Sequence, residues 1–190
     1  MALTEKNISS AADVQRILEA ARFAAQKHAQ QKRKGANGEP YVNHLLEVAQ
    51  LIAGSSDVLD TELVMAGLLH DTVEDTGVTP QELEERFGKD IAALVAEVTD
   101  DKSLPKETRK TLQIQNAPGK SERAQTLKLA DKISNLRSLL ANPPVGWDLE
   151  RKQQYFEWAR QVVAGLTAPN PVLKAEFDKT HAKVSQLKNR

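Results

Sequence analysis

The stretch around residue 70 constrains this chain more than any other. An apolar, leucine-rich run over residues 63–69 leads directly into a histidine and three carboxylates, which are His70, Asp71, Glu74 and Asp75. On a helix, residues three or four apart share a face, so His70 would lie beside Glu74 and Asp71 beside Asp75. Neighbouring carboxylates next to an apolar run are costly unless a positive group holds them. We therefore expect a divalent cation here, with an exposed acidic helix end as the alternative.

Helical periodicity continues through the rest of the chain. Apolar residues recur at three- and four-residue spacing, and turn-forming residues separate the apolar segments. The predicted helices cover residues 11–32, 42–53, 61 through the stretch around residue 70, 80–87, 90–98, 106–117, 123–140, 149–166 and 171–187. No alternating run is flanked by hairpin turns, and no internal repeat is present. The pattern predicts an all-α fold, a bundle of about eight to ten helices.

Length and charge limit the classes of function. A chain of 190 residues suffices for one domain with a substantial core, and we expect one domain over 1–190. Lys+Arg and Asp+Glu both number 26, so no overall field favours nucleic acid or an anionic membrane. There is no cysteine, which excludes disulfides and thiolate metal ligands. Residues 1–6 lack signal-peptide character and no apolar run has membrane-spanning length, so a cytoplasmic protein is expected.

Two distant segments carry side chains that complement the stretch around residue 70. His44 opens the second predicted helix, and Asp131 lies within a long one beside its apolar face. A buried aspartate needs a partner, and a salt bridge to Lys128 or Lys132 is the alternative to a metal. The candidate metal ligands are His44, His70, Asp71 and Asp131. Two imidazoles and two carboxylates without sulfur suit Mn²⁺ or Fe²⁺, with positions left for water and substrate.

These four residues match the metal-binding pattern of the HD-domain phosphohydrolases, and longer strings narrow the resemblance. R-K-G at 33–35 with P-Y-V-N-H at 40–44, H-D-T-V-E-D-T at 70–76 and L-A-D-K-I-S-N-L-R at 129–137 resemble the alarmone hydrolase domain of the Rel/SpoT family. V-T-D-D-K at 98–102 and Y-F-E-W-A at 155–159 resemble its small stand-alone branch, which includes the metazoan SpoT homologues. The resemblance spans about residues 12–168 and leaves no room for a synthetase domain. Leu45 departs from the proline that many relatives have after the ligand histidine.

The resemblance implies a guanosine-3′,5′-bis(diphosphate) 3′-pyrophosphohydrolase. Such an enzyme uses a metal, here expected to be Mn²⁺ with Fe²⁺ or another divalent cation as alternatives, to hydrolyse the 3′-pyrophosphate of (p)ppGpp. The products are GDP or GTP and pyrophosphate. The metal would bind the 3′ α-phosphate and lower the pKa of a bound water. Glu74 and Asp75 would orient or deprotonate that water, since this pair marks hydrolase competence in related enzymes.

The family's nucleotide-binding positions also have counterparts here. Asn135 matches a nucleotide contact, with helix packing as its alternative. Arg33 and Lys34 correspond to residues that flank the guanine, although the composition of the 34–38 loop leaves its reach open. The substrate carries two diphosphates and needs local positive charge, for which the lysines and the arginine around the 99–105 loop are candidates. They are Lys102, Lys106, Arg109 and Lys110, and surface solvation is an equally good reading for each lysine.

An aromatic and basic triplet follows the long predicted helix. Trp147, Arg151 and Tyr155 recur every four residues and so would project from one side of a helix. The metazoan members look similar here, which implies stacking or hydrogen bonding to the nucleotide. Packing of both aromatic side chains into the core is the alternative.

Three other functions remain open at this point. Metazoan members of the branch also remove the 2′-phosphate of NADPH, and the same pocket would accept that ester. A more distant possibility is an HD-type nucleotidase or cyclic phosphodiesterase, which Glu74-Asp75 and Arg33-Lys34 disfavour. A non-catalytic alarmone-binding module would need neither the ligand set nor Glu74. A homodimer is neither predicted nor excluded.

Overall fold

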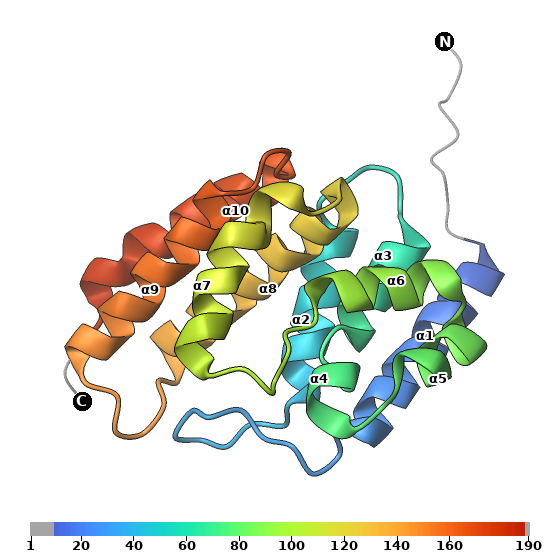
Figure 1. The fold of residues 1–190 in the computed structure, drawn as a ribbon, viewed down its shortest axis with the longest axis horizontal. Coiled ribbons are helices and arrows are strands. Elements are labelled where there is room, and N and C mark those ends of the chain that lie inside the picture. Colours follow the sequence, from blue (N-terminus) through green and yellow to red (C-terminus); the bar gives the residue numbers. More distant parts are fainter. Residues whose placement is uncertain (1–9, 189–190) are drawn as a thin grey trace.

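Helices form nearly all the secondary structure of the computed structural model, which describes residues 10–188 (Figure 1). Over these residues the β structure consists of two isolated bridges, Lys32–Pro40 and Gly35–Pro144. The all-α prediction is confirmed. Residues 1–6, for which the sequence predicts no signal peptide, lie outside the described residues.

The α-helices are α1 (Ala11–Lys27), α2 (Val42–Ala53), α3 (Thr61–Leu69), α4 (Thr72–Thr76), α5 (Pro80–Phe87), α6 (Lys89–Val98), α7 (Lys106–Asn116), α8 (Glu122–Ala141), α9 (Leu149–Ala164) and α10 (Pro171–His181). Two 3₁₀ turns complete them, η1 (Ala117–Gly119) and η2 (Ala182–Gln186). The first and last helices are shorter than predicted: α1 ends at Lys27, and α10 passes into η2 after His181. None of the described helices is both long and apolar enough to cross a lipid bilayer.

Side-chain caps begin most of these helices. Ser10 and Asp13 form a reciprocal capping box at the start of α1. Asp60 caps α3, and Ser121 caps α8 through the backbone N–H of the residue three positions on. Each cap satisfies backbone donors that a helix leaves free at its first turn. The caps fix where α3 and α8 begin, and hence the positions of the site residues that they carry.

Helix α8 runs through the middle of the molecule. It packs against α2, α3, α6, α9 and α10 (Figure 1), and its side chains Leu129, Ile133 and Leu136 are fully buried. Helices α1 to α6 lie on one side of it and α7, α9 and α10 on the other. Because both sides of α8 are covered, its polar residues lie inside the molecule and need internal partners.

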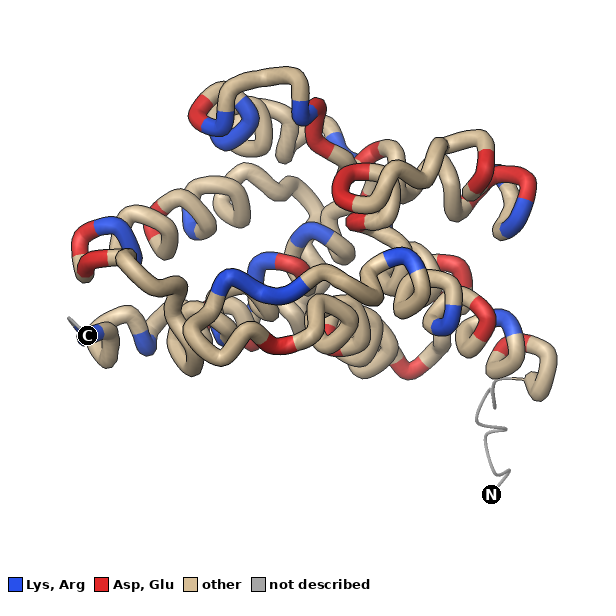
Figure 2. The backbone as a smooth tube through the Cα atoms, turned by 90° about the horizontal axis from the view of Figure 1, so that it is seen from below, with Lys and Arg blue, Asp and Glu red and all other residues tan. Residues whose placement is uncertain are grey.

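Three loops meet at one edge of the bundle, the lower edge in Figure 1: residues 28–41, 99–105 and 142–148. Figure 2 looks onto this edge, where the uninterrupted basic run of residues 32–34 crosses the middle of the view. The first loop is held to the third by the Gly35–Pro144 bridge and by Asn37 N–H, which donates to Asn142 Oδ1 at 3.2 Å. A Cβ on residue 35 would lie 2.4 Å from atoms of Asn142, so only glycine allows this approach.

Candidate metal centre and nucleotide cavity

The four side chains predicted to bind a metal converge at the loop-bearing edge. His44 comes from the first turn of α2, His70 and Asp71 lie between α3 and α4, and Asp131 lies in the middle of α8. His44 Nε2 is 3.4 Å from Asp131 Oδ1 and 3.7 Å from Asp71 Oδ2. His70 Nε2 is 3.1 Å from Asp71 Oδ2 and 3.9 Å from Asp131 Oδ1. Segments far apart in the chain therefore direct their polar atoms at one point.

The helix predicted to run through this stretch is interrupted, which corrects the expectation of shared helical faces. Helix α3 ends at Leu69, and α4 begins at Thr72 with Asp71 as its N-cap residue. The Thr72 hydroxyl donates to Leu69 C=O at 2.6 Å and supports the turn. Neighbouring residues of a regular helix project about 100° apart. The turn lets His70 and Asp71, although adjacent, reach the same point.

Both histidines present Nε2 to this point because Nδ1 is engaged elsewhere. His70 Nδ1 lies 2.8 Å from Gly67 C=O, and His44 Nδ1 lies 2.8 Å from Ser134 Oγ. His70 Nε2 is buried and, although it lies 3.1 Å from Asp71 Oδ2, it makes no well-aligned hydrogen bond with any described residue. Nitrogen and oxygen atoms of His44, His70 and Asp131 lie within 4.8 Å of one another. The donor set and the orphaned nitrogen fit a divalent cation, which would also draw on Asp71.

The electrostatics of these groups are strongly coupled. Burial lowers the pKa of His44. Burial would also lower the pKa of His70, but the carboxylates of Asp71 and Asp131 outweigh it and raise that pKa to about 9. Burial opposes ionisation of both aspartates, yet His70 lowers the pKa of Asp71, and Lys132 with His44 lowers that of Asp131. Both carboxylates are therefore ionised and available as ligands at neutral pH.

Asp131 also makes the salt bridge that was the alternative to metal binding. Its Oδ2 accepts from Lys132 Nζ at 3.0 Å, while Lys128 Nζ donates instead to Val98 C=O at 3.0 Å. Oδ1 accepts from Asn135 Nδ2 at 2.6 Å and is the oxygen that faces the histidines. Because the two oxygens have different partners, Lys132 can hold the carboxylate while Oδ1 remains directed at the centre.

Glu74 and Asp75 lie beside the centre and differ in environment. Burial, followed by repulsion from Asp71, raises the pKa of Glu74. The backbone N–H of Asp100 donates to Glu74 Oε2 at 3.2 Å. Asp75 accepts from Gln31 Nε2 at 2.7 Å and from Lys102 Nζ. Glu74 lines a cavity together with His70, Asp71 and Asp131, and its raised pKa suits a proton acceptor.

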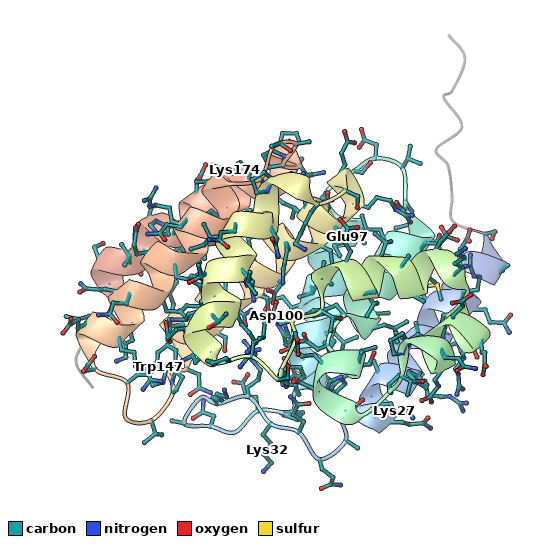
Figure 3. All side chains as sticks on the ribbon, in the orientation of Figure 1. Lys27, Lys32, Glu97, Asp100, Trp147 and Lys174 are labelled. Atoms are coloured by element: carbon teal, nitrogen blue, oxygen red, sulfur yellow. The ribbon has the colours of Figure 1, made fainter. Side chains whose placement is uncertain are left out.

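Two adjoining cavities surround the centre. The inner one, about 250 Å³, is lined by His70, Asp71 and Asp131, and the outer one, about 610 Å³, opens between the loops. Seven side chains line both: Lys34, Tyr41, Glu74, Lys106, Arg109, Asn135 and Tyr155. In Figure 3, side chains crowd beside and below the labelled Asp100, which lines the inner cavity, and Trp147 lies toward the lower edge.

Most side chains predicted to contact the substrate line the outer cavity. These are Arg33, Lys34, Lys102, Asn135, Trp147 and Tyr155. Arg33 Nη2 also donates to Asn135 Oδ1 at 2.8 Å, which links the first loop to α8. Arg151 lies apart, in a neighbouring hollow of about 410 Å³ that it shares with Trp147 and Tyr155. The structure therefore brings six of the seven together and places Arg151 beside them.

The aromatic triplet is not carried by one helix as predicted. Helix α9 begins at Leu149 with Asp148 as its cap, so Trp147 precedes it. The side chains nevertheless meet: the Trp147 and Tyr155 ring centroids are 5.8 Å apart, and the Arg151 guanidinium lies 4.5 Å from the Trp147 ring. The backbone turn that precedes α9 therefore brings Trp147 next to Arg151 and Tyr155, although Trp147 is not part of the helix.

Several contacts of the centre were absent from the prediction. Tyr41 O–H donates to Asp71 Oδ2 at 2.6 Å, and Ser134 Oγ joins His44 to Glu47. Tyr41 stands within the P-Y-V-N-H string, and Ser134 and Glu47 each follow a ligand by three residues. For Ser134 and Glu47, the three-residue spacing from a ligand, which puts both on the same helical face as that ligand, was the signal available in the sequence. Their pairing depends on how α2 packs on α8, which the sequence pattern does not specify.

The chain matches the model of the HD domain family over residues 20–156. A relative from Xenopus tropicalis named guanosine-3′,5′-bis(diphosphate) 3′-pyrophosphohydrolase MESH1 is 50% identical over 166 residues, which cover 87% of this chain and 93% of the relative. The human protein of the same name is 51% identical over 158 residues, covering 83% of this chain and 88% of the relative. The Drosophila melanogaster protein is 47% identical over 163 residues, covering 86% and 91%.

Solved structures agree with these relatives. One described as a metazoan ortholog of SpoT that hydrolyses ppGpp has a TM-score of 0.86 and 44% sequence identity, covering 95% of this chain and 99% of that one. A Listeria monocytogenes protein has a TM-score of 0.62 and 29% identity, covering 77% and 98%. Helical architecture, matching length and high identity coincide, and the chain belongs to the HD domain family and, within it, to the MESH1 proteins.

Proposed function

We propose that this protein is a metal-dependent hydrolase that removes the 3′-pyrophosphate of ppGpp or pppGpp. The observation that carries the proposal is the convergence of the His44, His70, Asp71 and Asp131 side chains on one point, beside a cavity that the last three line together with Glu74. The names of the relatives support the choice of substrate, because the identity to the Xenopus protein is 50% and extends over 93% of its length.

The metal ligands and Glu74 divide the chemistry between them. A divalent cation held by the two imidazoles and two carboxylates would act as a Lewis acid and lower the pKa of a bound water; Mn²⁺ is our first choice and Fe²⁺ the second. Glu74, whose pKa is raised by burial and by Asp71, accepts the proton of the attacking water. Asp75, held by Gln31 and Lys102, fixes the turn that carries Glu74.

The bond changes balance without a further reactant. The water oxygen forms a bond to the α-phosphorus of the 3′-diphosphate, and the bond from that phosphorus to the ribose 3′-oxygen breaks. Pyrophosphate leaves, and the ribose oxygen takes up a proton to give GDP or GTP. Arg109 and Lys106, which line both cavities, would bind the phosphates. Arg33, Lys34, Asn135, Tyr155 and Trp147 line the space proposed for the nucleoside, with Lys102 and Arg151 at its margins.

The decisive experiment measures pyrophosphate release from ppGpp by the purified protein, with and without added Mn²⁺. Asp131→Ala should bind Mn²⁺ poorly and show no turnover, because it removes a ligand. Glu74→Ala should keep the metal and lose about 10²–10⁴-fold in kcat, the usual contribution of a positioned base. Glu84→Ala, an exposed glutamate on α5, is the matched control and should be fully active.

Two results would contradict the proposal. Normal turnover by Glu74→Ala would remove that residue from the mechanism. A strong preference for NADPH over ppGpp, measured as kcat/KM on the two substrates side by side, would reassign the substrate while keeping the metal centre.

A further inference from the structure

A chain of hydrogen bonds leads away from His44 on the side opposite the candidate metal. His44 Nδ1 lies 2.8 Å from Ser134 Oγ, and the Ser134 hydroxyl lies 2.6 Å from Glu47 Oε2. The other oxygen of Glu47 accepts from Arg137 Nη1 at 2.9 Å, and Arg137 Nη2 donates to Glu176 at 2.7 Å. The chain connects α2, α8 and α10, and it includes none of the residues assigned to catalysis or substrate binding.

Glu47 sets the direction of the two hydrogen bonds that run from it through Ser134 to His44. Its carboxylate is paired with Arg137 at 2.9 Å, and the Ser134 hydroxyl donates to it. The serine oxygen then has only lone pairs to offer His44, so Nδ1 carries the proton and donates. Neutral His44 with its proton on Nδ1 has a lone pair on Nε2, which is the atom 3.4 Å from Asp131 Oδ1. A divalent cation needs this tautomer.

The other histidine is oriented by different means. His70 Nδ1 lies 2.8 Å from the backbone carbonyl of Gly67, an acceptor that no side-chain substitution removes. Ser134, in contrast, is fully buried, and its hydroxyl makes both bonds of the connection. One ligand histidine is thus fixed by the backbone and the other by side chains.

We propose that Ser134 and Glu47 are positioning residues for His44, and that Arg137 of α8, which is also paired with Glu176 of α10, holds Glu47 in place. The proposal rests on the metal centre of the proposed function. Ser134 and Glu47 act through His44 and touch neither metal nor substrate. They select the Nδ1–H tautomer and fix the ring, which raises the affinity for the metal before any nucleotide binds.

The test is a Mn²⁺ titration of the intact protein without nucleotide. Ser134→Ala should weaken Mn²⁺ binding about 10–100-fold, the usual cost of losing the partner of a metal-bound histidine. Glu47→Gln should weaken it as well, because an amide can donate to Ser134 Oγ and so favour the tautomer with the proton on Nε2. The controls are Thr126→Ala, which deletes another hydroxyl from α8, and Glu62→Gln, which neutralises another carboxylate paired with an arginine. Both should bind Mn²⁺ as the wild type does.

Two further readouts separate positioning from a merely structural role. Turnover of ppGpp by Ser134→Ala should recover to within a few-fold of wild type when Mn²⁺ exceeds its weakened dissociation constant, since the catalytic groups are intact. In the metal-free protein, ¹⁵N NMR should show the proton of neutral His44 on Nδ1, and the Nε2–H form should appear in Glu47→Gln. The NMR comparison also serves if Ser134→Ala folds poorly.

The outcomes are distinct for the two proposals. Wild-type Mn²⁺ affinity in both Ser134→Ala and Glu47→Gln, or an unchanged tautomer in Glu47→Gln, would overturn the positioning role. Failure of the wild type to release pyrophosphate while the Mn²⁺ titrations behave as stated would overturn the substrate assignment alone.

Discussion

His70 and Asp71 are neighbours in sequence that also meet in space, and each changes the proton affinity of the other. The proximity of Asp71 and Asp131 raises the pKa of His70 to about 9 despite its burial. His44, whose pKa is lowered by burial, remains neutral. In the metal-free protein at neutral pH, one imidazole is therefore charged and the other is not.

This difference predicts how metal binding depends on pH. Below about pH 9 His70 is protonated, so a metal must displace one proton from its Nε2. As pH rises toward 9 this competition weakens, and the apparent affinity for Mn²⁺ should increase about tenfold per pH unit between pH 6.5 and 8.5. Calorimetric titrations in buffers of different ionisation enthalpy should show release of about one proton per metal at pH 7.5. A pH-independent affinity would mean that Nε2 is already free.

At the scale of single residues, the sequence allowed prediction of four side chains that the structure brings together, but not of the residues that hydrogen-bond to them. The four ligands lie within recognisable strings, and the structure brings them together. Tyr41 and Ser134 bond across helices, at 2.6 Å to Asp71 and 2.8 Å to His44, and such pairs depend on how the helices dock.

Among the elements, the loops determine the shape of the nucleotide cavity. The 28–41 loop is anchored to the 142–148 loop at Gly35, and it places Arg33 against Asn135. Caps and glycines made most helix ends predictable. The interruption between Leu69 and Thr72 could not be predicted, because residues 69–72 include neither proline nor glycine. The hydrogen bond from the Thr72 hydroxyl that supports the turn leaves no trace in the pattern of apolar residues.

The close approach at Gly35 gives a prediction for the first loop. Gly35→Ala would bring a Cβ to 2.4 Å from Asn142, and overpacking of this kind costs about 1–3 kcal/mol. The loop should shift, raising KM for ppGpp while leaving Mn²⁺ affinity unchanged, since no metal ligand lies on it. Gly119→Ala meets no atom within 4 Å and is the matched control, with an expected change in stability within about 0.5 kcal/mol. Equal KM values for both variants would show that the loop does not shape the cavity.

For the molecule as a whole, the candidate metal site lies where three elements that are far apart in the sequence meet. It would join α2, the turn after α3 and the centre of α8, whose side chains also form the core. The all-α class followed from periodicity alone. The position of α8 between two groups of helices did not, because every predicted helix had an apolar face and nothing in the pattern says which one is covered on both sides.

Joining these regions predicts stabilisation by the metal. At a free Mn²⁺ concentration one hundred times the dissociation constant, binding adds about 2.7 kcal/mol to the free energy of unfolding. For a chain of this size that raises Tm by about 5–10 °C. Chelation should remove the increase, Asp131→Ala should lack it, and Glu74→Ala should keep it because Glu74 is not a ligand. A wild-type Tm that does not change when Mn²⁺ is added would contradict a metal centre at this position.

The unequal anchoring of the two imidazoles has a consequence for how this protein tolerates change over generations. The orientation of His70 depends on a peptide carbonyl and survives almost any drift in the surrounding sequence. The orientation of His44 depends on the Ser134 hydroxyl and the Glu47 carboxylate. Conservative substitutions of these residues, or of Glu176 on α10 farther along the same chain of hydrogen bonds, can therefore disturb the His44 ring. Loss of activity in descendants of this chain should therefore begin on the His44 side, with the H-D doublet still intact and its sequence signature unchanged.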